Sequence, residues 1–302
     1  MKLIQRPNIG QGVHRAGWVS VMGALYKEAD GKGMLLDDCV EYSFLFGPNR
    51  NRPHVEPWVG IFHFPSCIDS PVKEDLLQHS AEAVLRNPTF HASRKYLQSG
   101  IAMTQELASW LTEWLQVPFS VVKHPTDTNV PQWSLESFLA SPPLLLQLGF
   151  DLRNTRAIYH IVPVPGWRYA RIKFRHPEQI YRDKHLQQVM GGECNSTVEE
   201  WDRLSNGEYD KVLSSCVAIS EAFAIGGTNV VVECIARGTP LLTNQVAGAT
   251  EYLGTDYPLY LENFSELSPS TLLQAHQYLL SIQGSWLDCG TFAKKVREIV
   301  DQ

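Results

Sequence analysis

The sequence predicts an α/β protein in which two Rossmann-like domains, the N-terminal one short, face each other across a cleft. Three observations predict this fold. Short apolar runs alternate with segments of helical spacing, as in chains that build parallel sheets. The chain has 302 residues, which suggests two domains at about 150 residues each. Pro142 and Pro143 separate two series of such runs, and a double proline cannot continue a helix and stiffens the chain.

The first series predicts an N-terminal domain over residues 1–140. Strands are expected where short apolar runs occur, at Trp58–Phe64, Gly100–Thr104 and Phe119–Pro125. Helices are expected where apolar residues recur at three- and four-residue spacing, over Glu74–Leu85 and Gln105–Leu115.

The second series predicts another domain over residues 141–285, followed by an amphipathic closing helix over residues 286–302. Its strands are expected at Leu144–Phe150, Cys216–Ser220 and Pro240–Asn244. A helix is expected from Thr228 or Asn229, either of which is a good N-cap, to Arg237, with Gly238 as its left-handed cap. Because ligands bind outside the carboxyl ends of parallel strands, the cleft between the domains is the expected site.

The composition argues against several classes of function. The net charge of −6 makes a general nucleic-acid groove a poor interpretation, and the one basic run, Arg168–His176, is expected to be a solvated edge. No stretch approaches the ~18 apolar residues of a membrane span. The start, MKLIQRPNIGQG, is too short and too polar for a signal peptide. A cytoplasmic protein is therefore expected.

Neither a disulfide framework nor a metal site is expected. The six cysteines are scattered without a CxxC pair, which suits a reducing compartment. Asp37 and Asp38 lie in an early polar segment that is typical of a turn, and nothing resembles an acidic metal triad at a strand end. We therefore expect chemistry that needs no metal ion.

Glu233 stands in an otherwise apolar helix, where an ionised carboxylate is costly to bury unless it is paired or hydrogen-bonded. At four-residue spacing, Asn229, Glu233 and Arg237 form one polar stripe. The helix begins after Gly226 and Gly227, where the backbone can approach a ligand, and a helix N-terminus favours an anion. A phosphate there, with two hydroxyls at Glu233 one turn further on, would be a nucleoside diphosphate. The alternative is a surface ion pair between Glu233 and Arg237.

The segment Ser220–Leu261 resembles the donor-binding half of the nucleotide-sugar glycosyltransferases with GT-B architecture, the group 1 or family 4 enzymes. The resemblance rests on the helix that bears Glu233, on the Gly238-Thr239-Pro240 sequence after it, and on the later turn that ends in Thr250 and Glu251. It is weaker over Leu144–Arg156 and only architectural in the N-terminal half. It implies that residues 1–140 form the acceptor side and residues 141–285 the donor domain.

The resemblance also implies roles for the matching residues. Glu233 would hold the ribose hydroxyls. Arg153 and Arg156 would steady the departing diphosphate, whose negative charge grows in the transition state; ordinary surface charge is the alternative for both. The donor-binding residues that it implies are Gly149, Arg153, Arg156, Gly226, Gly227, Thr228, Asn229, Glu233, Thr250 and Glu251.

The catalytic candidates are His63 and Glu221. In retaining members a further glutamate precedes the ribose-binding one with seven residues between them; that position is Ile225 here, which leaves Glu221 further back and the stereochemical outcome open. His63 ends a strand, where relatives carry a histidine near the donor sugar, so it would be a hydrogen-bond donor or a general base unless it is structural. His124 also follows a strand. The glycine pair in Ile9–Arg15 would line the acceptor site or form an ordinary turn.

Three kinds of function remain open. The first is a hexosyltransferase-like transfer, without a metal or cofactor, from a UDP or GDP sugar as co-substrate to a glycan, small-molecule or protein acceptor. The second is a nucleotide-sugar epimerase or hydrolase on the same fold. The third is a catalytically degenerate scaffold or partner subunit, which Ile225 and the short chain favour.

Overall fold

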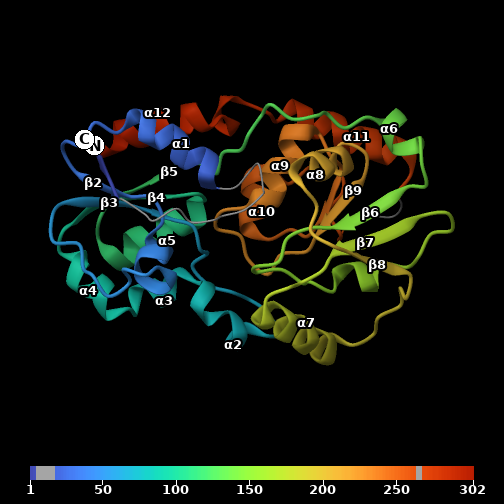
Figure 1. Ribbon diagram of the computed structural model, residues 1–302, viewed down its shortest axis with the longest axis horizontal. Helices are drawn as coiled ribbons and strands as arrows, with labels where there is room; N and C mark the ends of the chain where they lie inside the picture. The colour runs from blue at the N-terminus through green and yellow to red at the C-terminus, as the bar shows by residue number, and fades with distance from the viewer. Residues whose placement is uncertain (5–17, 263–266) are drawn as a thin grey trace.

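The computed structural model describes residues 1–4, 18–262 and 267–302. Two lobes lie side by side, each built on a five-stranded parallel sheet with helices packed around it (Figure 1). The predicted α/β class with two Rossmann-like domains is therefore confirmed. The glycine pair expected near the acceptor, in Ile9–Arg15, lies outside the described residues.

The first sheet has the strand order β1-β2-β3-β4-β5, in the order of the chain. Trp58–Phe62 is buried along its whole length, because parallel strands are covered on both faces, and this explains its continuous apolar run. All five strands run parallel: β1 (Lys2–Leu3), β2 (Leu35–Asp37), β3 (Trp58–Phe62), β4 (Leu97–Ala102) and β5 (Phe119–Val121).

The helices of the first domain follow the predicted pattern with one difference. α5 spans the predicted residues because the Thr104 hydroxyl accepts from the Leu107 N–H and caps it. The helix expected over Glu74–Leu85 is divided, since Ser80 is extended and its side chain accepts from the Ala83 N–H to start a new helix. The α-helices are α1 (Trp18–Glu28), α2 (Lys73–Leu76), α3 (Ala81–Leu85), α4 (Pro88–Arg94) and α5 (Gln105–Leu115), with a π-helix at Tyr42–Phe46 and a 3₁₀ turn at Leu77–His79.

The second sheet has the order β10-β9-β6-β7-β8, so its chain order reverses between β6 and β9. Such a reversal opens a crevice at the carboxyl ends of the two strands on either side of it, where ligands of doubly wound proteins bind. The strands, all parallel, are β6 (Leu144–Gln147), β7 (Arg168–Ile172), β8 (Val198–Trp201), β9 (Val217–Ser220) and β10 (Leu241–Thr243).

The helix that bears Glu233 has the predicted bounds. The Thr228 hydroxyl accepts from the Val231 N–H at its start, and Gly238 ends it at φ +65°, in the left-handed region. The helices of the second domain are α6 (Leu135–Leu139), α7 (Pro177–Met190), α8 (Asn206–Leu213), α9 (Asn229–Arg237), α10 (Ala247–Leu253) and α11 (Pro269–Ser281), with 3₁₀ turns at Ala157–His160 and Ser285–Leu287.

The basic run Arg168–His176 is not the solvated edge that we expected. Its first half forms β7, which lies between β6 and β8 in the interior of the sheet. Arg171 is buried there because its guanidinium donates to both carboxylate oxygens of Asp183, at 2.7 and 3.0 Å. A buried charge is tolerated when it is paired and hydrogen-bonded in this way.

Within the described ranges the chain passes from the first domain to the second and back, and these two passages run side by side. Trp133 and Phe138 already belong to the second core, so the chain enters the second domain before the double proline. The Thr126 N–H donates to the Leu287 carbonyl at 2.8 Å where the chain returns. The closing helix α12 (Cys289–Val300) then packs on α1 in the first core, and both chain ends lie at the same end of the molecule (Figure 1).

Candidate functional site

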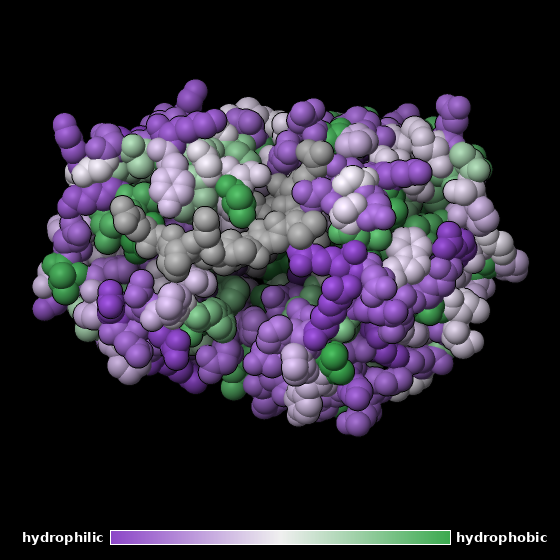
Figure 2. Space-filling model, in the orientation of Figure 1, coloured by the Kyte–Doolittle hydropathy of each residue, from purple (hydrophilic) through white to green (hydrophobic). Residues whose placement is uncertain are grey.

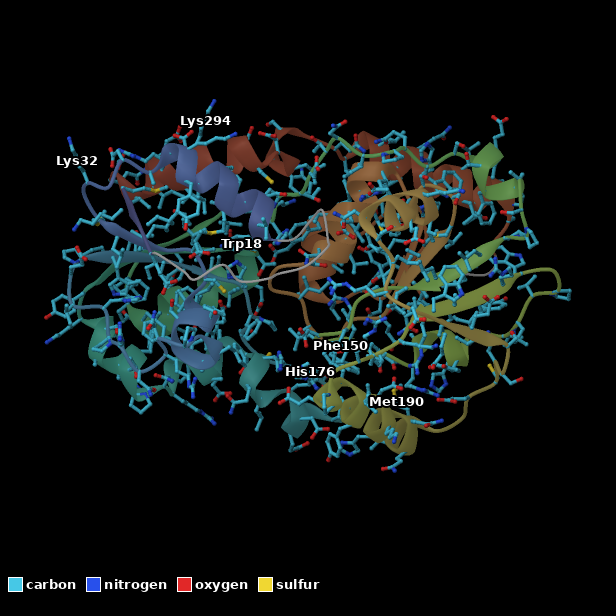
Figure 3. All side chains as sticks on the ribbon, viewed as in Figure 1. Trp18, Lys32, Phe150, His176, Met190 and Lys294 are labelled. Atoms are coloured by element: carbon cyan, nitrogen blue, oxygen red, sulfur yellow. The ribbon has the colours of Figure 1, made fainter. Side chains whose placement is uncertain are left out.

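A cleft of about 730 Å³ lies between the two domains, at the reversal point of the second sheet. Trp18 and Phe150, which come from opposite domains, both line it and lie near the midline in Figure 3. The first domain contributes Trp18, Cys39, His63, Phe64 and His124. The second contributes residues 147–153, 171–175 and 203–204, together with Gln179, Tyr209, Ala224, Gly227, Asn229, Val230 and Glu233.

Glu233 lies in the wall of this cleft with 1% of its surface exposed. The Tyr209 hydroxyl, from α8, donates to Glu233 Oε2. Burial, and then the charge of Glu233, raise the pKa of Tyr209 well above its usual value, so the hydroxyl keeps its proton and remains a donor. Sequence reasoning missed Tyr209, because nothing local links it to a residue 24 positions away.

The surface pair between Glu233 and Arg237 that the sequence left open is not formed. Arg237 is fully buried, and its Nη2 donates to Asp210 Oδ1 at 2.6 Å. Its Nη1 donates to the backbone carbonyl of Glu233 at 3.2 Å rather than to the carboxylate. Arg237 therefore anchors α9 to α8, while the Glu233 carboxylate stands at the cleft.

Arg153 is held at the cleft by three hydrogen bonds. Its Nε donates to Ser220 Oγ at 3.0 Å, Nη1 to the Asp151 carbonyl at 2.6 Å and Nη2 to Thr228 Oγ1 at 3.3 Å. Burial lowers the pKa of Arg153, whereas Asp151, Tyr209 and Glu233 act in the opposite direction. The guanidinium has five N–H groups, and these bonds use three of them, so its orientation is set while donors remain for a ligand.

Gly149 makes room for this arginine. Its φ of +80° is a conformation that side chains rarely adopt, and a Cβ there would lie 2.6 Å from Arg153 Cδ. Gly149, two residues after β6, therefore has two physical reasons to be a glycine, and the second of them leaves room for Arg153.

The lining of the second domain is rich in cations. Lys173 and Arg175 follow β7, and Arg203 follows β8, so these side chains start from the carboxyl ends of neighbouring strands. Among the described residues of the lining, Asp151 and Glu233 are the acids. Strongly hydrophilic residues gather on the second domain beside the midline in Figure 2. Sequence reasoning missed these cations because β7 itself was not expected.

The loop before α9 meets the first domain directly. The Gly227 N–H donates to the His63 carbonyl at 2.7 Å, and a Cβ on Gly226 would lie 2.1 Å from that same oxygen. These two glycines therefore allow the backbones of the two domains to approach, and Gly227 also lines the cleft. Thr228 is buried as the cap of α9, and Asn229 lines the cleft one residue further on.

Six of the candidates are not among the lining residues of the cleft. Gly226 and Thr228 belong to the loop and cap before α9, and other groups hold the remaining four. Arg156 is buried against Asp183, with Nη1 donating to Oδ2 at 3.1 Å, and against Glu193. Glu221 accepts from Asn154 Nδ2 at 2.9 Å.

The other two belong to α10. Thr250 donates to the Ala247 carbonyl at 2.8 Å. Glu251 accepts from the backbone N–H groups of Gln105 and Glu106 at the start of α5, with its Oε1 3.0 Å from the Glu106 nitrogen. It joins the two domains rather than facing the cleft.

His63 stands directly after β3 and faces the cleft. Glu41 Oε1 accepts from the backbone N–H groups of His63 and Phe64 at 2.6 and 2.8 Å, and Glu41 Oε2 lies 3.2 Å from His63 Nδ1. Burial lowers the pKa of His63, but Cys39 and Glu41 raise it by more, to about 10. Of the roles that the sequence left open, which are a hydrogen-bond donor, a general base and a structural residue, a raised pKa favours the donor over the general base.

His124 stays neutral beside it. The ring is buried, and burial together with the charge of His63 lowers the pKa of His124 to about 3. Its backbone N–H donates to the Tyr252 hydroxyl at 2.8 Å, so the residue is part of the contact between the first domain and α10.

The acids that we expected in a turn, Asp37 and Asp38, are both buried. Asp37 Oδ2 lies 2.9 Å from His54 Nε2, and Asp38 Oδ2 accepts from Trp18 Nε1 at 2.8 Å. They hold the carboxyl end of β2 and the start of α1 in place, so they belong to the support of the cleft.

Known proteins match this chain in structure and not in sequence. Neither a family profile nor a curated protein matches it. The HepE protein of Anabaena, solved in complex with UDP, is 13% identical over 98% of this chain and 84% of its own, with a TM-score of 0.58. A UDP-forming α,α-trehalose-phosphate synthase from Burkholderia vietnamiensis is 11% identical over 94% of this chain and 78% of its own, with a TM-score of 0.55.

Sucrose-phosphate synthase from Thermosynechococcus elongatus is 15% identical over 93% of this chain and 72% of its own, with a TM-score of 0.53. At these identities the likeness shows the fold. The protein has the GT-B glycosyltransferase fold, as the resemblance of its sequence over Ser220–Leu261 implied. Across the described ranges, none of the helices is long and apolar enough to cross a membrane.

Proposed function

We propose that this protein is a glycosyltransferase that moves a sugar from a nucleoside-diphosphate sugar to an acceptor. One observation carries the proposal: Arg153 and Glu233 line the same cleft, at the reversal point of the second sheet. An oriented guanidinium and a carboxylate in one interdomain cleft match the two ends of a nucleoside diphosphate.

Glu233 is the proposed ribose anchor. Its Oε2 is held by Tyr209, which orients the carboxylate toward vicinal hydroxyls in the cleft. A hydrogen bond to a charged group contributes about 1.5–3 kcal/mol, so two such bonds would supply much of the nucleotide affinity.

Arg153 and the start of α9 are the proposed diphosphate site. The leaving diphosphate gains charge in the transition state, and a pre-oriented guanidinium stabilises that charge without reorganising. Asn229 begins α9, and the N-terminus of a helix favours an anion. The cations that line the cleft after β7 and β8 add to the positive potential there.

His63 is the proposed contact to the donor sugar or its phosphate from the first domain. Its carbonyl is bound to the Gly227 N–H, so His63 and the start of α9 are placed relative to each other by one direct hydrogen bond. The Nε2–H of the ring would donate to an oxygen of the donor.

Uracil is the proposed base of the donor nucleotide. HepE, with the same fold, was solved in complex with UDP, and the trehalose-6-phosphate protein of E. coli was solved bound with UDP-2-fluoro glucose at a TM-score of 0.52 to this chain. Both are similar in fold alone, so the base and the sugar need direct measurement.

The test compares thermal shifts with UDP, GDP, ADP and their sugars for the wild type, Glu233→Gln and Arg153→Gln. Glu136→Gln and Arg86→Gln, both at exposed positions, are the matched controls. A nucleotide at 100 times its dissociation constant should stabilise the fold by about 2.7 kcal/mol, and the two cleft variants should lose most of that. Equal shifts in all five proteins would refute the assignment of the cleft.

One observation favours a second candidate, a nucleotide-binding partner subunit without turnover. Ile225, at the position where retaining relatives carry an acid, is buried in the second core, and the carboxylate of Glu221 is held by Asn154. Release of the nucleoside diphosphate from its sugar distinguishes the candidate functions. Release that depends on an added acceptor indicates transfer, and release without an acceptor indicates hydrolysis. Binding of the nucleotide sugar without release indicates the partner subunit.

A further inference from the structure

The first domain holds a cluster of three metal-binding side chains that the proposed function does not use together. Cys39 and Glu41 follow β2, and His63 follows β3. These strands are parallel neighbours, with Asp37 paired to Gly60, so the residues that follow them meet at the same edge of the sheet. The sulfur, one carboxylate oxygen and one ring nitrogen all lie within 4.8 Å of one another.

Two of the distances in the cluster match those between the ligands of a tetrahedral zinc ion. Glu41 Oε2 lies 3.2 Å from His63 Nδ1 and 3.7 Å from Cys39 Sγ. A tetrahedral zinc ion with bonds of about 2.0 Å to N and O and about 2.3 Å to S separates N from O by about 3.3 Å and S from O by about 3.6 Å. We propose that Cys39 Sγ, Glu41 Oε2 and His63 Nδ1 bind one zinc ion.

The charges of the cluster fit a divalent cation. A thiol and a carboxyl group face a single imidazole, in a site where Glu41 is buried and Cys39 and His63 are half-buried. Ligands bind zinc in their deprotonated forms, so a thiolate and a carboxylate would together balance the two charges of the ion. The thiolate selects a soft ion and argues against magnesium or calcium, which prefer oxygen ligands.

The carboxylate is already oriented for this role. Glu41 Oε1 accepts from the backbone N–H groups of His63 and Phe64, which leaves Oε2 directed at the other two ligand atoms. Such hydrogen bonds to a ligating group fix its geometry in metal sites.

The fourth position would open to the cleft, because Cys39 and His63 both line it. Three protein ligands with an open position are the arrangement of zinc sites that bind water or a substrate oxygen. The ligand would be a water or a hydroxyl that enters the cleft from the acceptor side. This inference goes beyond the proposed function and revises the expectation of chemistry without metal; the sequence hid the cluster because the histidine is 22 positions from the glutamate.

The test measures metal in the full-length protein without nucleotide. The chain is loaded with Zn²⁺, dialysed, and assayed for metal by mass spectrometry; a second sample is loaded with Co²⁺ and scanned for the thiolate-to-cobalt charge-transfer band in the near ultraviolet. Cys39→Ser is the variant, and Cys67→Ser, at an exposed cysteine, is the control. We expect one equivalent of zinc and the band in the wild type and in Cys67→Ser, and at least tenfold weaker zinc binding without the band in Cys39→Ser.

The proposal is overturned if the wild type retains no more zinc than Cys39→Ser, or if Co²⁺ produces no thiolate band; the cluster would then be held by its hydrogen bonds alone. The band is measured on the wild type, so misfolding of the variant cannot decide the result. The UDP shift of the same samples is recorded separately, so a failed zinc site and a failed nucleotide site are distinguishable.

Discussion

Gly149 connects one backbone angle to the proposed diphosphate site. An alanine there would be strained by the φ of +80°, and its Cβ would lie only 2.6 Å from Arg153 Cδ. We expect Gly149→Ala to cost about 1–3 kcal/mol from the backbone strain and, in addition, to weaken nucleotide binding by moving Arg153. Urea unfolding and UDP titration measure the two effects.

Gly166→Ala is the matched control. Gly166 has a similar φ of +85°, with no atom within 4 Å of an added Cβ. It should lose stability without losing affinity. Equal affinities in the two variants would show that Arg153 does not depend on the glycine.

Tyr209 is a positioning residue for Glu233. Replacing it with phenylalanine removes the hydroxyl that donates to a buried carboxylate, which should cost about 1–3 kcal/mol of unfolding free energy. It should also raise the dissociation constant for UDP. Tyr181→Phe, at a residue that is 61% exposed, should change neither. An unaltered urea midpoint for Tyr209→Phe would contradict this role.

For single residues, the sequence indicated which residues to consider for the site better than it indicated which groups they contact. Arg153 and Arg156 are three positions apart and looked equivalent, yet Arg153 lines the cleft and Arg156 is bound by Asp183 from α7. For Glu233 the sequence left open a cleft or a surface pair with Arg237, because an acid in an apolar helix is costly only where it is buried and unpaired; in the structure Glu233 lines the cleft. The Cys39 cluster could not be predicted, since its members meet only after two strands pair.

Among the elements, α10 and α5 form the clearest link between the domains. The Glu251 carboxylate accepts from the first N–H groups of α5, and the neighbouring Tyr252 hydroxyl donates to the Met103 carbonyl at 3.0 Å. We expect Glu251→Ala to lower the unfolding free energy by about 0.5–2 kcal/mol, as the loss of a helix cap does. Thermal unfolding measures this.

Glu113→Ala, on an exposed position of the same helix α5, is the control and should have little effect. If both substitutions gave the same melting temperature, the Glu251 contact would not stabilise the interface.

Elements with local signals were predicted well. α5 and α9 begin at threonine caps and α9 ends at a glycine, all of which are visible in sequence. β7 was missed because its arginines suggest solvent, and only Asp183, twelve positions further along the chain, makes Arg171 a residue of the interior. The helix predicted over Glu74–Leu85 was too long. The apolar spacing continues through Ser80, but the backbone of Ser80 is extended and interrupts the helix.

For the whole molecule, Asp30 links the two chain ends. The Met1 amino group, the Lys32 N–H and the Arg297 guanidinium hold the pKa of the Asp30 carboxyl well below its usual range. A depressed carboxyl pKa contributes stability that is present above the pKa of the unfolded chain and is lost as the pH falls. Asp30→Asn should therefore melt below the wild type at pH 7, with a difference that shrinks as the pH is lowered through the acid range.

Asp202→Asn serves as the comparison, since Asp202 is exposed and its bond to Arg175 is 3.5 Å long. It should melt with the wild type at each pH. A difference for Asp30→Asn that grows toward acid pH would have the wrong sign for this account.

Cysteine labelling should report unfolding of the second domain. Cys216 and Cys234 are buried in its core, and burial raises the pKa of Cys216 to about 12, so both thiols stay protonated and protected. Cys67 and Cys194 are exposed and should react first. In pulse labelling during a urea titration, Cys216 and Cys234 should become reactive together at the transition; early reaction of either alone would mean that the core opens locally.

The adjacent passages at Thr126 and Asp288 make the second lobe an insertion within the first, since both chain ends belong to the first lobe. If the segment between these two points were removed, the two ends left on the first lobe would lie close enough for a very short linker to join them. Replacing that segment with the corresponding one from another protein of the same fold would change one wall of the cleft and leave the other intact. A truncation after Leu287 would instead remove α12 from the first core.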